Sequence, residues 1–221
     1  MMRAITFDLD NTLLDFIGFK KKASAAAMDA MIKAGFKGNK SKLRKELFDF
    51  YLQNGIEKDD IFQRFLKKHK KFSDRILAAG INAYLRSKYD NLRPYPKVMP
   101  TLRKLRQKGY KLAIVSDAPR LKAYMRLDAA GMADMFDAVV GLEDTGRVKP
   151  SRLPFRKALK ELGVKPSEAM HVGDWRERDV LGAKRAGLKT CFARYGKNKL
   201  GKKVWADHYI DRFEDILKVL L

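Results

Sequence analysis

The sequence predicts an α/β protein whose core is a mainly parallel sheet with helices on both faces, interrupted by an all-helical insertion. A short apolar segment opens the chain at 3–9. The stretch from about residue 18 to about residue 92 is helix-forming, rich in Lys, Ala, Leu and Phe, and holds no convincing strand. After Pro94-Tyr95-Pro96, short apolar runs alternate with helical stretches, which is typical of parallel sheets.

The opening segment ends on acidic residues, so we expect a buried strand with Asp8 and Asp10 at its carboxyl end. Within the insertion, apolar spacing and glycine punctuation predict four helices, at roughly 19–34, 40–53, 58–70 and 73–87. The aromatic residues of these helices recur at helical spacing, which favours a packed core over a surface that stacks nucleic-acid bases.

The second part of the chain supplies the rest of the core. The expected strands are 111–116, 138–141, 169–172 and 189–193, with a short edge strand at 208–210. The expected helices are 97–108, 121–130, 153–162, 179–186 and 212–219. The core is therefore built from both ends of the chain.

Composition narrows the class of protein. The 221 residues carry a net charge of +22, which attracts anions such as phosphorylated metabolites, nucleic acid or anionic lipid. The single cysteine, Cys191, excludes a disulfide framework within one chain. No apolar run approaches the roughly 20 residues that span a bilayer, and an acidic residue follows the N-terminus too soon for a signal peptide. We expect a cytoplasmic protein, and the sequence sets no oligomeric state.

Ligands of open α/β sheets bind beyond the carboxyl ends of the strands, and reactive residues follow four of the predicted strands. They are Asp8 and Asp10, then Ser116, then Lys149, then Asp174 and Asp179. Asp8, Asp10 and Asp174 would repel one another without a cation, and Mg²⁺ prefers such oxygen ligands. With the Lys149 ammonium and the Ser116 hydroxyl directed at one anion, this is the electrostatic arrangement that phosphoryl transfer needs.

These residues carry a resemblance to the haloacid dehalogenase (HAD) superfamily. The segment 7–13, Phe-Asp-Leu-Asp-Asn-Thr-Leu, resembles its first motif. Val115-Ser116-Asp117 resembles the second motif and Val148-Lys149-Pro150 the third. Gly173-Asp174, with Asp179 five residues later, resembles the fourth. The four motifs occur in the order of the family and extend over nearly all of the core, which makes the resemblance specific.

The resemblance implies a fold and a domain division. The core becomes a Rossmann-like domain of residues 1–17 and 93–221, and residues 18–92 a helical cap of the C1 type. It also implies a reaction, the Mg²⁺-dependent hydrolysis of a small phosphorylated metabolite through an aspartyl-phosphate intermediate.

Roles are implied position by position. Asp8 would be the nucleophile and a metal ligand, and Asp10 the general acid/base, with its backbone carbonyl on Mg²⁺. Ser116 and Lys149 would hold the transferring phosphoryl group. Asp174 would ligate Mg²⁺, and Asp179 would support it directly or through water. The binding residues Thr12 and Asp117 complete the expected set: Thr12 steadies the loop around Asp10, and the main-chain amide of Asp117 reaches the phosphate.

Three alternatives stay open. A phosphomutase uses the same first step, and the motifs do not separate it from a phosphatase. A haloacid dehalogenase is disfavoured because this chain keeps Asp10 and Asp174, which those metal-free enzymes do not need. A basic nucleic-acid-binding protein on the same fold is compatible with the net charge, although no nucleic-acid motif is present. Outside the motifs, we expect His171 to be a packed core histidine and Trp175 to pack in its loop or border the substrate.

Overall fold

The computed structural model describes residues 1–55, 58–196 and 204–220. The chain divides into two compact units, one of Met1–Asp15 with Arg93–Leu221 and one of Phe16–Leu92. The first boundary lies two residues before the expected one, because α1 already begins at Phe16. Among the described residues, no helix combines the length and the apolar character needed to cross a bilayer.

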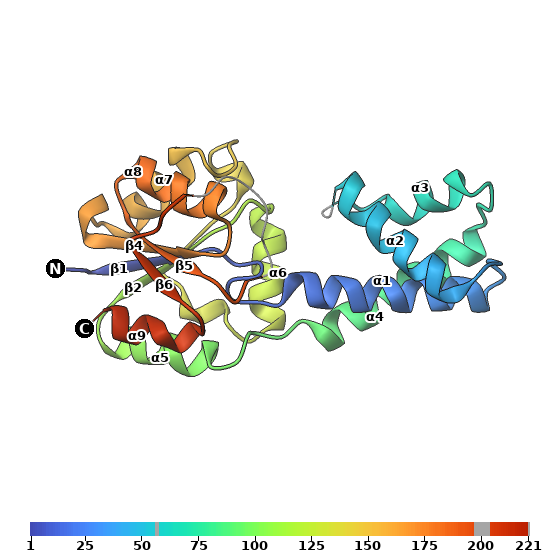
Figure 1. Cartoon of the computed structure of the whole chain (residues 1–221), viewed down its shortest axis with the longest axis horizontal. Helices are drawn as coiled ribbons and strands as arrows, with labels where there is room; N and C mark the ends of the chain where they lie inside the picture. Colours follow the sequence, from blue (N-terminus) through green and yellow to red (C-terminus); the bar gives the residue numbers. More distant parts are fainter. Residues whose placement is uncertain (56–57, 197–203, 221) are drawn as a thin grey trace. The chain divides into compact units, whose positions relative to one another are not determined.

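The described residues of the first unit form a six-stranded sheet in which every neighbouring pair is parallel, in the order β3-β2-β1-β4-β5-β6. The strands are β1 (Ala4–Phe7), β2 (Lys111–Val115), β3 (Ala138–Val140), β4 (Ala169–Gly173), β5 (Lys189–Ala193) and β6 (His208–Ile210). Helices α7 (Arg152–Leu162) and α8 (Leu181–Ala186) cover one face of the sheet, and α5 (Val98–Gln107) and α9 (Ile216–Val219) cover the other (Figure 1). The predicted fold class is confirmed.

Strand register sets where the site residues emerge. β1 lies between β2 and β4, and Phe7 is the register partner of both Ile114 and Val172. The chain therefore leaves the three central strands at one edge, at Asp8, at Ser116 and at Asp174. Helix α6 (Arg120–Ala129) begins a few residues beyond this edge, after β2.

Two predicted helices have a different form. The helix expected at 179–186 is a π-helical turn, Arg176–Val180, followed by α8, and its Asp179 carboxylate accepts a hydrogen bond from the Trp175 N–H at 2.8 Å. The helix expected at 212–219 begins as a 3₁₀ turn, Phe213–Asp215, followed by α9. There the Asp215 carboxylate accepts from the Arg212 N–H at 3.1 Å and tightens the first turn.

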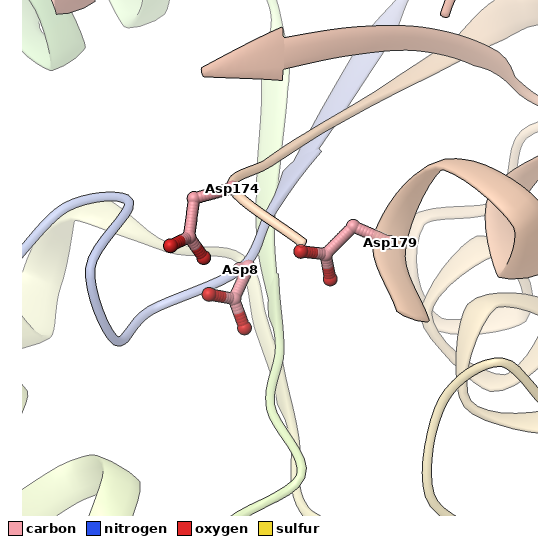
Figure 2. A group of neighbouring side chains, drawn as sticks. All are labelled: Asp8, Asp174 and Asp179. Atoms are coloured by element: carbon pink, nitrogen blue, oxygen red, sulfur yellow. The ribbon is translucent and has the colours of Figure 1, made fainter. Parts of the chain in front are cut away.

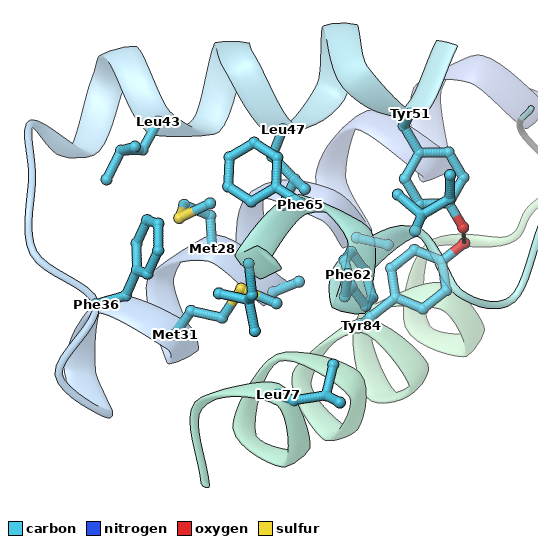
Figure 3. Packing of buried hydrophobic residues seen from close by; sticks show 14 residues of the cluster. Met28, Met31, Phe36, Leu43, Leu47, Tyr51, Phe62, Phe65, Leu77 and Tyr84 are labelled. Carbon is cyan, nitrogen blue, oxygen red and sulfur yellow. Dashed lines mark hydrogen bonds between the residues drawn. The ribbon is translucent and has the colours of Figure 1, made fainter. Parts of the chain in front are cut away.

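The second unit, apart from residues 56–57, is a cluster of four helices with its own apolar core. Its helices are α1 (Phe16–Lys33), α2 (Lys40–Asn54), α3 (Ile61–Lys68) and α4 (Asp74–Asn91). Each helix sends buried side chains into a shared centre, including Met31 from α1, Leu47 from α2, Phe65 from α3 and Leu77 from α4 (Figure 3). The aromatic side chains of this unit thus include core residues, as their spacing predicts.

Candidate active site

Asp8 begins the loop that follows the central strand. Its backbone N–H continues the pairing with β4 by donating to the Val172 carbonyl at 2.9 Å. The loop then closes on itself, because the N–H of Leu13 donates to the carbonyl of Leu9 at 3.0 Å. Asn11 has a φ of 65°, which a short polar side chain tolerates in such a turn. This tight loop brings the Thr12 hydroxyl to 3.3 Å from the Asp8 carboxylate.

Three buried carboxylates meet beside this loop. Asp8, Asp174 and Asp179 each offer an oxygen within 4.8 Å of the others, and Figure 2 shows the three side chains around a common space. The neighbouring backbone is close enough to fix two of them. A Cβ on Gly173 would lie 2.3 Å from the Asp179 carboxyl carbon, and a Cβ on Gly196 would lie 2.1 Å from the Asp174 Cβ. Both positions therefore require glycine.

Lys149 lies between two of these carboxylates. Its ammonium donates to Asp8 Oδ1 at 2.6 Å, to Asp179 Oδ1 at 2.7 Å and to the Val115 carbonyl at 3.0 Å. The side chain is 2% exposed, so these contacts replace water for all three of its protons. A buried charge with such complete pairing is held in one position.

The charged groups of the cluster shift one another's pKa values. Burial raises the pKa of Asp8 well above its usual value, and the carboxylates of Asp179 and Asp174 raise it further, against the opposing effect of Lys149. Burial acts to lower the pKa of Lys149, but the carboxylates of Asp179 and Asp8 outweigh it, and the pKa is raised. Burial also opposes the ionised form of Asp179, but Lys149 and the hydrogen bond from His171 leave its pKa lowered.

The donor set fits a hard divalent cation. Three carboxylate groups in a buried space, balanced by one ammonium, leave an excess of negative charge. Carboxylate oxygens are the ligands that Mg²⁺ takes in proteins, usually one or two of them together with substrate phosphate. A divalent cation beside Asp8 would also favour the ionised carboxylate that a nucleophile requires.

His171 and Thr6 extend the cluster into the sheet. His171 Nε2 lies 3.4 Å from Asp179 Oδ1, and its Nδ1 lies 2.8 Å from the Thr6 hydroxyl on the neighbouring strand. The ring is buried edge-on against Phe155, and burial lowers its pKa. The expectation of a packed core histidine is thus correct but incomplete, because the ring also contacts the Asp179 carboxylate and supports its position. Thr6 and Asp8, two polar residues at alternate positions of an apolar strand, were the sequence signal for this network.

Asp10 lies apart from the carboxylate cluster. Its carboxylate does not belong to the three-aspartate group and instead pairs with the guanidinium of Arg126 on α6, with Oδ2 and Nη1 2.5 Å apart. Arg126 was missed by sequence reasoning because it is one of 48 basic residues and belongs to no motif. Only the fold brings it to the first loop, 116 residues earlier in the chain.

The remaining predicted residues follow β2. The Ser116 hydroxyl is buried and accepts a hydrogen bond from the Ala118 N–H at 3.1 Å, so its own proton can be donated to a ligand. Asp117 accepts from the Lys149 backbone N–H at 2.8 Å and from Arg178 Nη1 at 3.0 Å. The guanidinium of Arg178 stacks on Trp175, 4.0 Å from the ring centroid, so Trp175 packs within its loop.

The motif residues thus follow the strands at one edge of the sheet, and comparison with known proteins identifies the family of the chain. A family model described as haloacid dehalogenase-like hydrolase matches residues 2–187. The chain belongs to this hydrolase family. The family resemblance inferred from the four motifs is therefore confirmed.

Relatives of this HAD-like hydrolase are named as phosphatases. A glyceraldehyde 3-phosphate phosphatase of Methanopyrus kandleri is 36% identical over 200 residues, covering 89% of this chain and 86% of that protein. A phosphoglycolate phosphatase of Aquifex aeolicus is 32% identical over 224 residues, covering 99% and 97%. Among solved structures, a HAD phosphatase from Thermococcus onnurineus superimposes with a TM-score of 0.72 at 28% identity, covering 99% of this chain and 98% of that one.

Proposed function

We propose that this HAD-like hydrolase is a Mg²⁺-dependent phosphatase that hydrolyses a small phosphorylated metabolite through an aspartyl-phosphate on Asp8. One observation carries the proposal, the buried bridge from Asp8 through the Lys149 ammonium to Asp179, with Asp174 beside it. It supplies a positioned nucleophile, a fixed positive charge and a set of metal ligands at one sheet edge. The names of the relatives support the same reaction class and a small substrate.

In the first proposed step, a carboxylate oxygen of Asp8 attacks phosphorus, and the bond from phosphorus to the leaving oxygen breaks. Asp10 gives its proton to that oxygen, which departs as an alcohol. Lys149 keeps the Asp8 carboxylate oriented for attack, and the Ser116 hydroxyl donates to a phosphoryl oxygen. Thr12, which donates to Asp8, holds the loop in place.

In the second step, water attacks the phosphorus of the aspartyl-phosphate. Asp10 takes a proton from that water, the bond between phosphorus and Asp8 breaks, and inorganic phosphate leaves. Asp8 and Asp174 would hold Mg²⁺, with the backbone carbonyl of Asp10 and with Asp179 as a supporting group. The cation, when bound, offsets negative charge on the carboxylates and on the phosphoryl oxygens.

The proposal assigns the helical unit Phe16–Leu92 to the cap of these enzymes, which distinguishes leaving groups. The net charge of +22 has a role in it as well, because a basic surface raises the encounter rate with an anionic substrate. Steep salt dependence of kcat/KM at low ionic strength would follow from this steering.

The test is a panel of phosphorylated metabolites, including glyceraldehyde 3-phosphate and phosphoglycolate, assayed with Mg²⁺ and after removal of divalent cations by a chelator. Asp8→Asn should abolish turnover, and acid-quenched wild-type protein should carry phosphate on the peptide that contains Asp8. Asp128→Asn, at an exposed position on α6, is the matched control and should keep full activity. Turnover by Asp8→Asn, or undiminished activity without a divalent cation, would contradict the mechanism.

A further inference from the structure

Arg126 forms an ion pair that none of the four motifs describes. It lies on the last turns of α6, and its side chain is 4% exposed, while that of Asp10 is 20% exposed. Its guanidinium stays protonated in a protein, so a position this buried requires a hydrogen-bond acceptor close by. The Asp10 carboxyl group supplies an acceptor in either protonation state, with Nη1 and Oδ2 2.5 Å apart.

We infer that Arg126 is a positioning residue for proton transfer: it fixes the orientation of the Asp10 carboxyl group that exchanges a proton with the leaving oxygen and then with water. This inference rests on the proposed phosphatase function. A carboxyl group that carries a proton holds it on one oxygen while the other accepts hydrogen bonds. Because Arg126 donates to Oδ2, the exchanged proton is assigned to Oδ1.

The placement of Arg126 suits this role better than a role in folding alone. Asp10 lies on a short loop, and a carboxylate there has rotational freedom unless another group holds it. A guanidinium offers a planar set of donors that fixes the carboxylate plane as well as its position. α6 also follows directly from the segment that carries Ser116 and Asp117, so the same part of the chain positions the phosphate-binding hydroxyl and the proton-transfer group.

A positioning role predicts a selective loss of activity. An alkyl phosphate expels a strongly basic oxygen and needs the proton from Asp10, whereas p-nitrophenyl phosphate expels a stable phenolate and needs it far less. Arg126→Met should therefore lower kcat/KM for phosphoglycolate or another alkyl substrate by about 100-fold, and for p-nitrophenyl phosphate by less than about fivefold. The parameter kcat/KM is the right one, because it reports steps through the first phosphoryl transfer.

Two further variants separate positioning from folding. Arg126→Lys keeps the charge but lacks the planar fork, and we expect a selective loss of about tenfold for the alkyl substrate. It carries the same test should Arg126→Met not fold. Arg120→Gln, on the first turn of the same helix, removes the ion pair between its half-exposed guanidinium and Asp144 and should change neither rate.

A double-mutant cycle provides the decisive comparison. In an Asp10→Asn background, Arg126→Met should add no further leaving-group selectivity, because the group that it positions no longer transfers a proton. Equal losses for both substrates in folded Arg126 variants, or selectivity that persists without Asp10, would overturn the inference. A wild-type protein inactive on every phosphate ester would instead refute the proposed function, so the two failures are distinct.

Discussion

Gly173→Ala tests how tightly the carboxylate cluster is packed against the backbone. The added methyl carbon would lie 2.3 Å from the Asp179 carboxyl carbon, 2.4 Å from its Oδ2 and 2.5 Å from its Cβ. Carbon atoms in protein interiors pack at about 3.5–4.0 Å, so the Asp179 side chain has to move by more than 1 Å or the strand has to shift. Both responses disturb the carboxylate cluster.

The loss of stability depends on the hydrogen bonds that the Asp179 carboxylate accepts. Its Oδ1 accepts from Lys149 at 2.7 Å, and its Oδ2 accepts from the Trp175 N–H at 2.8 Å. Buried hydrogen bonds to charged groups contribute about 1.5–3 kcal/mol each. The Gly→Ala change offsets less than about 1 kcal/mol of this loss, because alanine lowers the conformational entropy of the unfolded chain. We expect a net decrease of about 3 kcal/mol in the free energy of unfolding. Because Lys149 also loses its support, we expect kcat to fall by about 100-fold.

Urea denaturation and steady-state kinetics measure the two effects. Gly109→Ala is the matched control, since its φ of 83° makes alanine strained, by about 1 kcal/mol, in otherwise open space, and it should leave kcat unchanged. In an Asp179→Gly background, where the carboxylate and the Cβ that would lie 2.5 Å away are both absent, Gly173→Ala should cost less than about 1 kcal/mol. A Gly173→Ala protein with wild-type stability and activity would show that the cluster is not packed as described.

Two other predictions concern buried titratable groups. Burial raises the pKa of Cys191 to about 12, so iodoacetamide at pH 8 should modify the folded protein far more slowly than the urea-unfolded protein; similar rates would contradict the burial. Burial lowers the pKa of His171 in the folded state, so the unfolded chain binds more protons below about pH 6.5, and stability should fall as the pH drops through that range. His171→Asn should flatten this part of the pH dependence of urea unfolding, and an unchanged slope would refute it.

The fold was predictable because its signals are local. Each core strand is a short apolar run, and most helices have a glycine or an acidic residue near an end, so periodicity identifies the elements with boundaries off by a few residues. The turn before α8 escaped prediction: it is π-helical, and within it the Asp179 carboxylate accepts a hydrogen bond from the Trp175 backbone N–H. Side-chain contacts with the backbone of this kind are not visible in hydrophobic periodicity.

The site was predictable only as far as strand ends define it. Asp8, Ser116 and Asp174 follow paired strands, so their convergence follows from topology alone. The contact between Asp10 and Arg126 does not follow from topology. Arg126 lies near the C-terminal end of α6, and the packing of that helix decides which way its side chains point. A single charge among many has no pattern that marks it, and only the three-dimensional contact distinguishes Arg126 from its exposed neighbours.

The polar network also depends on Asp8 following a strand that has neighbours on both sides. Thr6 and Asp8 are two residues apart on and just after β1, so their side chains point to the same face of the sheet. Thr6 is the register partner of His171 on β4, and the network runs from this pair through Asp179 and Lys149 back to Asp8. This network requires a strand on each side of β1. His171 lies on β4, and Lys149 also donates to the Val115 carbonyl of β2. At an edge strand one side would be open to water, and the Lys149 ammonium would lose the buried environment in which it holds Asp8.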